Sequence, residues 1–126
     1  MLGDKDAVAT IAVKDLDVAR KFYEGTLGLK PAEEQEPGSL TLKSGSSTIF
    51  LYESQYAGTN QATALTWGDV DVDGIVQALK AKGVKFEHYD DLPDTAREGD
   101  VHVAGDLRLA WFKDPDGNVL ALAGRR

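Results

Sequence analysis

Three side chains of this sequence are the best candidates for acid–base or anion-binding chemistry. Glu53 could act as a general base if it were withdrawn from water, or could simply be a solvated carboxylate. His102 could gate a binding site or relay a proton, because an imidazole titrates near neutral pH. Arg108 could anchor a ligand carboxylate or phosphate, or pair with Glu53. The one other histidine is His88, and there is no cysteine, so nucleophilic catalysis has few candidates.

Composition excludes several classes of protein. The chain has 126 residues, a formal charge of −7 and no cysteine, so it holds no disulfide, thiolate zinc site or iron–sulfur cluster. The acidic balance disfavours nucleic acid and suits a neutral or cationic small molecule. No segment approaches the ~20 apolar residues of a membrane span, and the acidic start lacks a secretory signal. We therefore expect one cytoplasmic domain that binds neither nucleic acid nor a membrane.

The first half of the chain predicts a strand, a helix and three further strands. Residues 8–13 form an apolar run typical of a strand, and Asp15 is a good N-cap for the helix that follows. Gly28 ends that helix. A short strand is expected within 29–34. The next two strands, 39–43 and 47–53, are expected to form a hairpin.

The second half repeats this pattern. Asp71, which lies 56 residues after Asp15, opens a second helix that ends at Gly83. Strands are predicted at 63–69, 84–88, 107–113 and 118–123, with a long polar loop over about 90–106. The chain therefore predicts two βαβββ modules in an α+β fold: module 1 over about 7–54, a linker over 55–62, and module 2 over about 63–124.

Several short motifs stand out along the chain. They are Val13-Lys14-Asp15-Leu16, Phe22-Tyr23, Leu27-Gly28-Leu29, Leu79-Lys80-Ala81-Lys82-Gly83-Val84 and Phe112-Lys113-Asp114-Pro115-Asp116-Gly117-Asn118. In order and spacing they resemble motifs of the vicinal oxygen chelate superfamily, which includes glyoxalase I, extradiol dioxygenases, fosfomycin-resistance enzymes and bleomycin-resistance proteins. The resemblance spans nearly the whole chain, and it implies that the two modules form one cupped mixed sheet, often completed by a homodimer.

The resemblance also implies where a divalent metal would bind. Enzymes of the superfamily usually hold the ion with His, Gln or Glu on the first and last strand of each module. In this sequence the first-strand positions are Val8 and Ala64, and the last-strand positions are Leu51 and Ala121. Aliphatic side chains offer no lone pair, so we expect no metal and no other cofactor. A shifted register could make Glu53 a single ligand.

Strand alternation in the first hairpin predicts which side chains face the cup. A three-residue loop at 44–46 would pair Leu42 with Thr48. Leu51 and Glu53 would then face the cup, and Phe50 would lie behind the sheet.

The same argument applies to the second hairpin. A four-residue turn after Lys113 would turn Arg108 and Phe112 into the cup, where Phe112 could stack on a planar ligand. Both tryptophans, Trp67 and Trp111, would lie behind the sheet, against the helix. The predicted ligand-binding residues are Thr10, Leu51, Glu53, Thr66, His102, Arg108 and Phe112.

We expect a metal-free protein that binds a small organic ligand, is of the glyoxalase/bleomycin-resistance type and forms a homodimer. One alternative is an enzyme, a lyase, isomerase or dioxygenase-like protein, that uses Glu53, Arg108 or His102. A second alternative is a non-catalytic module that binds another protein.

Overall fold

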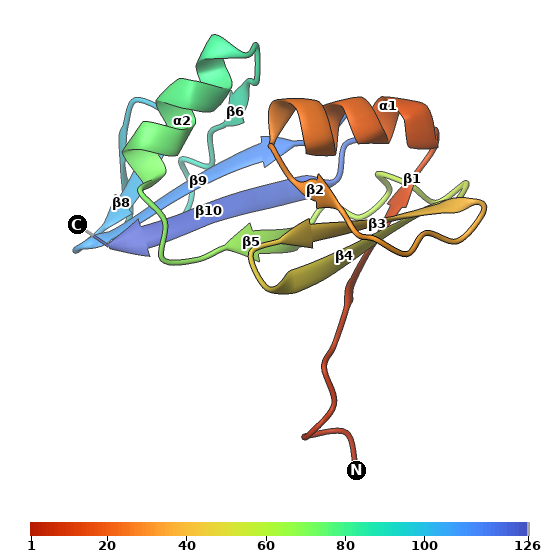
Figure 1. Cartoon of the computed structure of the whole chain (residues 1–126). Helices are drawn as coiled ribbons and strands as arrows, with labels where there is room; N and C mark the ends of the chain where they lie inside the picture. The colour runs from red at the N-terminus through yellow and green to blue at the C-terminus, as the bar shows by residue number, and fades with distance from the viewer. Residues whose placement is uncertain (126) are drawn as a thin grey trace. The chain divides into compact units, whose positions relative to one another are not determined.

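A computed structural model describes residues 1–125 of the chain. It divides into two compact units, Met1–Gly58 and a second that begins at Thr59, and the boundary falls within the expected linker 55–62 (Figure 1). Both units combine strands with a helix, so the predicted α+β class is confirmed. No helix within residues 1–125 is long and apolar enough to cross a membrane.

The first unit has the predicted βαβββ order. Its sheet runs β1-β4-β3-β2, with β1 parallel to β4 and the other pairs antiparallel. The elements are β1 (Ala9–Val13), α1 (Leu16–Arg20), the π-helix η1 (Lys21–Thr26), β2 (Lys30–Pro31), β3 (Ser39–Ser44) and β4 (Ser47–Glu53).

The helix of the first unit begins and ends where the sequence predicts. The Asp15 carboxylate accepts hydrogen bonds from the backbone N–H groups of Asp17 (2.8 Å) and Val18 (3.2 Å). The α-helix α1 continues directly into the wider π-helix η1. Gly28, at φ 81°, then takes the left-handed conformation that a helix end requires.

The hairpin of the first unit has a shorter loop than the sequence predicted. Ser44 pairs with Ser47 and Leu42 with Ile49, so the loop is the two-residue Gly45-Ser46. Gly45, at φ 58°, supplies the positive angle that two-residue hairpin loops favour. The expected pairing of Leu42 with Thr48 is therefore wrong by one residue, and this shift reverses the faces of β4 relative to β3.

The corrected register gathers the apolar side chains of the first sheet on one face. Directly paired residues share a face, so Leu51 lies beside Ile11 and opposite Leu40. These side chains are buried with Tyr23 of η1, and this side is the helix face of the sheet. The opposite side, the far face, carries Thr10 and Phe50.

The second unit has its own sheet, in the order β5-β10-β9-β8-β7, and β6 pairs separately with β9. Figure 1 shows α2 lying on one side of this sheet. The elements are β5 (Thr63–Trp67), α2 (Val72–Ala81), β6 (Phe86–Glu87), β7 (Ala96–Glu98), β8 (Val101–Ala104), β9 (Leu107–Lys113) and β10 (Val119–Arg125).

One edge of β9 is shared by two partners. β6 pairs with it through Phe86 and Phe112, whereas β8 pairs with it over Leu107–Leu109. The segment 90–106, predicted as a long loop, therefore contains the β7–β8 hairpin. Because this segment is rich in polar residues, the sequence did not predict its short strands. β8 and β9 are joined by the two-residue turn Gly105-Asp106.

The turn between β9 and β10 fixes the register of the second sheet. The Asp114 carboxylate accepts hydrogen bonds from the backbone N–H groups of Asp116 and Asn118 (both 2.9 Å) and from the Asn118 side-chain amide (2.8 Å). Both side chains are buried. Asn118 is thereby held inside a five-residue turn, and Lys113 pairs with Val119.

This turn is one residue longer than predicted, so the faces of β9 are the reverse of those expected. Arg108 pairs with Gly124, where a Cβ atom would meet the Val70 carbonyl just before α2. Arg108 and Phe112 therefore point to the helix face, and Trp111 points to the far face.

The five-residue turn predicts that Asp114 is important for stability. We expect Asp114→Ala to lower the free energy of unfolding by about 2 kcal/mol, because it leaves buried donors without their charged acceptor. Asp106→Ala, which removes an exposed carboxylate from the neighbouring β8–β9 turn, should change stability little. Chemical denaturation of the two variants measures the difference, and equal effects would contradict the assigned role of Asp114.

The register of the first sheet makes a second prediction. Leu51 is fully buried on the helix face, so Leu51→Ala should cost about 3 kcal/mol in the free energy of unfolding. Tyr52 has a larger side chain but is 39% exposed on the far face, so Tyr52→Ala should cost clearly less. Urea unfolding of both variants provides the comparison. A larger loss for Tyr52→Ala would show that the register is misassigned.

Candidate functional site

Three rings meet on the far face of the second sheet. Trp111 of β9 contacts His102 of β8 edge to face, with ring centroids 4.9 Å apart at 84°. Tyr89, from the segment after β6, contacts Trp111 in the same manner at 5.2 Å and 80°. The Tyr89 and His102 rings are 6.1 Å apart. We call Tyr89, His102 and Trp111 the aromatic cluster.

The Trp111 ring is held in one orientation. Its indole N–H donates a hydrogen bond to the hydroxyl oxygen of Thr63 on β5 (3.1 Å), and His102 packs against the ring. On β10 the residue paired with Trp111 is Ala121, which is in turn paired with Thr66 of β5. Because the methyl group of Ala121 is small, the half-buried indole has little side-chain volume beside it on the side of β10.

His102 is the buried polar member of the cluster, with only 1% of its surface exposed. Its Nε2 accepts a hydrogen bond from the backbone N–H of Tyr89 (2.9 Å), which places the proton of the neutral ring on Nδ1. Nδ1 lies near the Leu109 carbonyl but outside good hydrogen-bond geometry. Burial lowers the pKa of His102 below 6.5, because removal from water disfavours the charged imidazolium.

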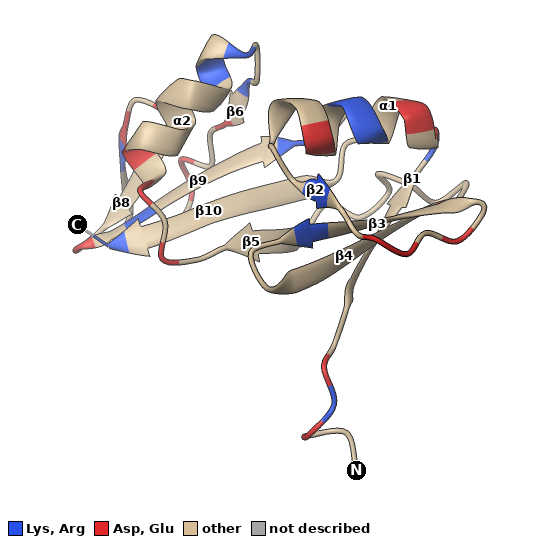
Figure 2. Cartoon of the chain, viewed as in Figure 1, with Lys and Arg blue, Asp and Glu red and all other residues tan. Residues whose placement is uncertain are grey.

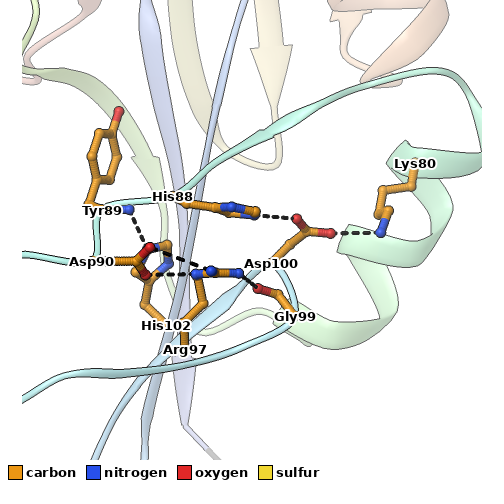
Figure 3. Close-up of polar contacts among 8 residues, drawn as sticks. All are labelled: Lys80, His88, Tyr89, Asp90, Arg97, Gly99, Asp100 and His102. Atoms are coloured by element: carbon orange, nitrogen blue, oxygen red, sulfur yellow. Dashed lines mark hydrogen bonds and ion pairs between the residues drawn. The ribbon is translucent and has the colours of Figure 1, made fainter.

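Two ion-pair groups hold the segment 88–100 that carries Tyr89 (Figure 3). The Asp100 carboxylate lies 2.7 Å from Lys80 of α2 and 2.7 Å from His88, and hydrogen bonds from both lower the pKa of Asp100. The Arg97 guanidinium donates to Asp90 (2.7 Å) and to the Gly99 carbonyl (2.7 Å), and its hydrogen bond lowers the pKa of Asp90. These contacts tie His88 and Asp90, the two neighbours of Tyr89, to β7 and to the turn between β7 and β8.

Arg108 lies on the helix face, where it binds carboxylates of its own unit. Its guanidinium forms a bidentate pair with Asp73 of α2 (2.7 and 2.8 Å) and lies 3.7 Å from Glu98, whereas the sequence offered Glu53 as partner. Asp73 raises the pKa of Arg108. The expectation that Arg108 faces the cup rested on the four-residue turn and is corrected with it.

Phe112 is likewise a core residue. It is fully buried, stacks on Trp67 at 6.4 Å and 13°, and contacts Phe86 edge to face at 5.5 Å. The structure therefore confirms that Trp67 lies on the helix face and corrects the placement of Phe112, which the sequence assigned to the cup.

The remaining predicted site residues divide between the two units. Thr10 and Thr66 lie on the far faces of their sheets, as alternation predicted. Leu51 lies on the helix face instead of the cup face, because the two-residue hairpin loop shifts the register. Glu53, at the exposed end of β4, lines a shallow pocket of about 340 Å³ with Lys14, Ser54 and Gln55.

The four positions at which the family resemblance implies metal ligands do not fit an ion. Val8, Ala64 and Ala121 end in carbon, and Leu51 is packed on the helix face. The free lone pair of His102 is used by the Tyr89 amide. Within residues 1–125, no three His, Asp or Glu side chains lie close enough together to hold a metal. These residues offer no donor set for a divalent cation.

Sequence reasoning missed two residues of the aromatic cluster. It placed Trp111 behind the sheet and did not include Tyr89 among the site residues. A two-residue turn at Gly105-Asp106 sets His102 opposite Leu109, and Trp111 shares the face of Leu109. This turn was the available signal that His102 and Trp111 lie on one face.

Comparison with solved structures gives the same fold. A protein described as of the glyoxalase family from Bacillus anthracis superposes with a TM-score of 0.74 at 18% identity, with 100% of both chains covered. FosX, a fosfomycin resistance protein from Listeria monocytogenes crystallised with Mn(II) and sulfate, gives 0.72 at 17% identity, covering 98% of this chain and 91% of its own. TnmS3, an antibiotic-binding protein from Streptomyces, gives 0.67 at 23% identity, with 98% of both chains covered.

No curated protein matches the sequence. A family model, in contrast, matches residues 6–122, which is nearly the whole chain. The order of elements in the first unit and the chain-length structural matches agree with that result. The chain belongs to the Glyoxalase/Bleomycin resistance protein/Dioxygenase superfamily.

Proposed function

We propose that this protein binds a planar aromatic small molecule, without a metal ion, against Trp111 on the far face of its second sheet. One observation carries the proposal. Ala121, which occupies a position where related enzymes hold a metal ligand, is paired across the sheet with the indole of Trp111. The chain thus has an aromatic surface at Trp111 beside Ala121, whose side chain has no donor atom for a metal ion.

The geometry of the cluster favours a flat ligand. Trp111 is half-buried, and its contacts with Thr63 and His102 fix the plane of the indole before a ligand arrives. A surface that is already ordered loses little conformational entropy on binding. Offset stacking or an edge-to-face contact with such a ring contributes about 0.5–1.5 kcal/mol beyond the area that is buried.

Charge favours a neutral or cationic ligand. Between Arg108 and Lys113 strand β9 carries no charged residue, and β10 carries none before Arg125 (Figure 2). The whole chain has a formal charge of −7, which repels anions and attracts cations over longer distances. A cation delocalised over an aromatic ring system would gain further from the face of the indole.

Two structural neighbours differ in what they bind. TnmS3 is an antibiotic-binding protein, which supports the proposal, whereas FosX was crystallised with Mn(II). Because Val8, Ala64 and Ala121 have no donor atom in their side chains, we propose that the protein binds an organic ligand and does not use a metal. A homodimer and a cytoplasmic location remain part of the proposal, the first because of the family resemblance and the second because the chain has no cysteine.

The metal-free part of the proposal predicts that divalent ions leave the protein unchanged. Protein purified without chelator should contain only sub-stoichiometric metal by elemental analysis. Added Mn(II), Ni(II), Zn(II) or Fe(II) should not raise the melting temperature, because only an ion that binds the native state stabilises it. Stoichiometric metal, or a saturable rise in melting temperature that is lost in His102→Gln, would overturn this part.

The ligand part predicts that Trp111 and not Trp67 determines affinity for a flat cation. Proflavine, which is planar and cationic, serves as the probe, and its fluorescence polarisation reports binding. We expect Trp111→Ala to weaken proflavine binding by about tenfold, in keeping with the loss of about 1.4 kcal/mol of stacking and area.

The chain provides a matched control for this experiment. Trp67 lies in the same sheet but stacks on Phe112 on the helix face, so Trp67→Phe should keep the affinity for proflavine while lowering stability. Anthraquinone-2,6-disulfonate, a planar anion, should bind more weakly than proflavine. Equal losses in the two tryptophan variants, or no saturable binding of either probe, would contradict the proposed site.

A further inference from the structure

We propose that His102 is a positioning residue that holds Tyr89 against Trp111 only while its imidazole is neutral, so that mild acid releases Tyr89 and weakens binding at this face. The proposal rests on the proposed function for its second part, the change in affinity. The first part, the release of Tyr89, concerns the protein alone.

The hydrogen bond between Tyr89 and His102 exists in one protonation state. The backbone N–H of Tyr89 donates to the Nε2 lone pair over 2.9 Å. A proton on Nε2 would place two donors opposite each other at that distance, so the contact must break or open. Because His102 is 1% exposed, an unpaired imidazolium there would also lack water.

The loss of this contact would reach the Trp111 surface directly. Tyr89 contacts Trp111 at 5.2 Å, and the hydrogen bond to His102 is made by the backbone of the same residue. On either side of Tyr89, the chain is held by side-chain contacts of His88 and Asp90. The bond to His102 is therefore the polar contact that draws Tyr89 itself toward the sheet.

Burial affects the pKa of His102 more than the nearby charged groups do. The Leu109 carbonyl and Asp90 favour a positive charge on the ring, whereas His88 and Arg97 disfavour it. The Tyr89 ring is a further titratable neighbour. On the sheet the neighbours in β9 and β10 are uncharged, namely Leu109, Trp111 and Ala123. Desolvation is the largest effect, and it lowers the pKa of His102 from 6.5.

The sign of the pH dependence follows from this direction. Well above pH 6.5 the imidazole is neutral in both the folded and the unfolded state, and it contributes no pH dependence to stability. As the pH falls below 6.5 the unfolded chain takes up the proton first, so stability declines until the folded pKa is reached. Asp90 and Asp100, whose pKa values lie below 3.8, keep their charges in this range.

The first test needs no ligand. In full-length ¹⁵N-labelled protein, the Tyr89 amide resonance and its hydrogen exchange are followed from pH 7.5 to 4.5 together with the His102 ring signals. We expect the amide to shift upfield and to exchange faster, with the same midpoint as His102 and below pH 6.5. A Tyr89 amide that stays unchanged down to pH 4.5 overturns the proposal.

Two variants distinguish the protonation of His102 from other effects of low pH on the protein. In His102→Gln the amide oxygen can still accept from Tyr89 but does not titrate, so the Tyr89 amide should become independent of pH between 7.5 and 4.5. His88→Gln removes the exposed histidine that pairs with Asp100. The Tyr89 amide should still respond to pH with the midpoint of His102, which moves slightly upward because the charge of His88 no longer opposes a proton on that ring. Loss of the pH response in His88→Gln with its persistence in His102→Gln would also overturn the proposal.

The second test measures proflavine affinity over the same pH range. Below the His102 midpoint we expect the wild-type dissociation constant to rise by up to about tenfold per pH unit, because only the neutral form is competent to bind. His102→Gln should bind equally well at pH 7.5 and 5.0. If proflavine fails to bind at pH 7.5, the proposed function fails, and the Tyr89 resonance still decides the role of His102. If Tyr89 is released at low pH but the affinity for proflavine does not change, only the proposed link between release and affinity is refuted.

Discussion

The hydrogen bonds that the Asp114 carboxylate accepts decide which side chains each face of the second sheet presents. They draw Asn118 into the turn and set Lys113 opposite Val119. Because side chains alternate along a strand, one residue more or less in this turn exchanges the two faces of β9 completely. The turn begins three residues after Trp111, and it determines that Trp111 belongs to the aromatic cluster.

The two faces of the second sheet have different energetic roles. On the helix face, Phe112 is fully buried against Trp67, and Arg108 satisfies its charge with Asp73 of α2. On the far face, polar contacts serve to orient rings: Thr63 orients the indole, and His102 binds the amide of Tyr89. The same strand therefore provides stability on one side and a pre-ordered aromatic surface on the other.

Local chemistry in the sequence predicts the elements well but the registers poorly. Asp15 and Asp71 cap helices, and Gly28 and Gly83 have positive φ, because these preferences act over a few residues. Both hairpin loops were misjudged by one residue, and this error displaced Leu51, Arg108, Phe112 and Trp111. Loop length depends on side-chain hydrogen bonds inside the turn, such as those of Asp114, which the apolar pattern of the strands does not reveal.

The division of one edge of β9 between β6 and β8 has a mechanical consequence. Tyr89 follows β6 at the point where the backbone leaves one partner region of β9 and has not yet reached the other. If the β7–β8 hairpin and the segment before it were to open as a local unit, the free-energy cost would be below that of unfolding the sheet. The pairing of Phe86 with Phe112 lies in the other partner region of β9, so such an opening would leave this contact of the helix face in place.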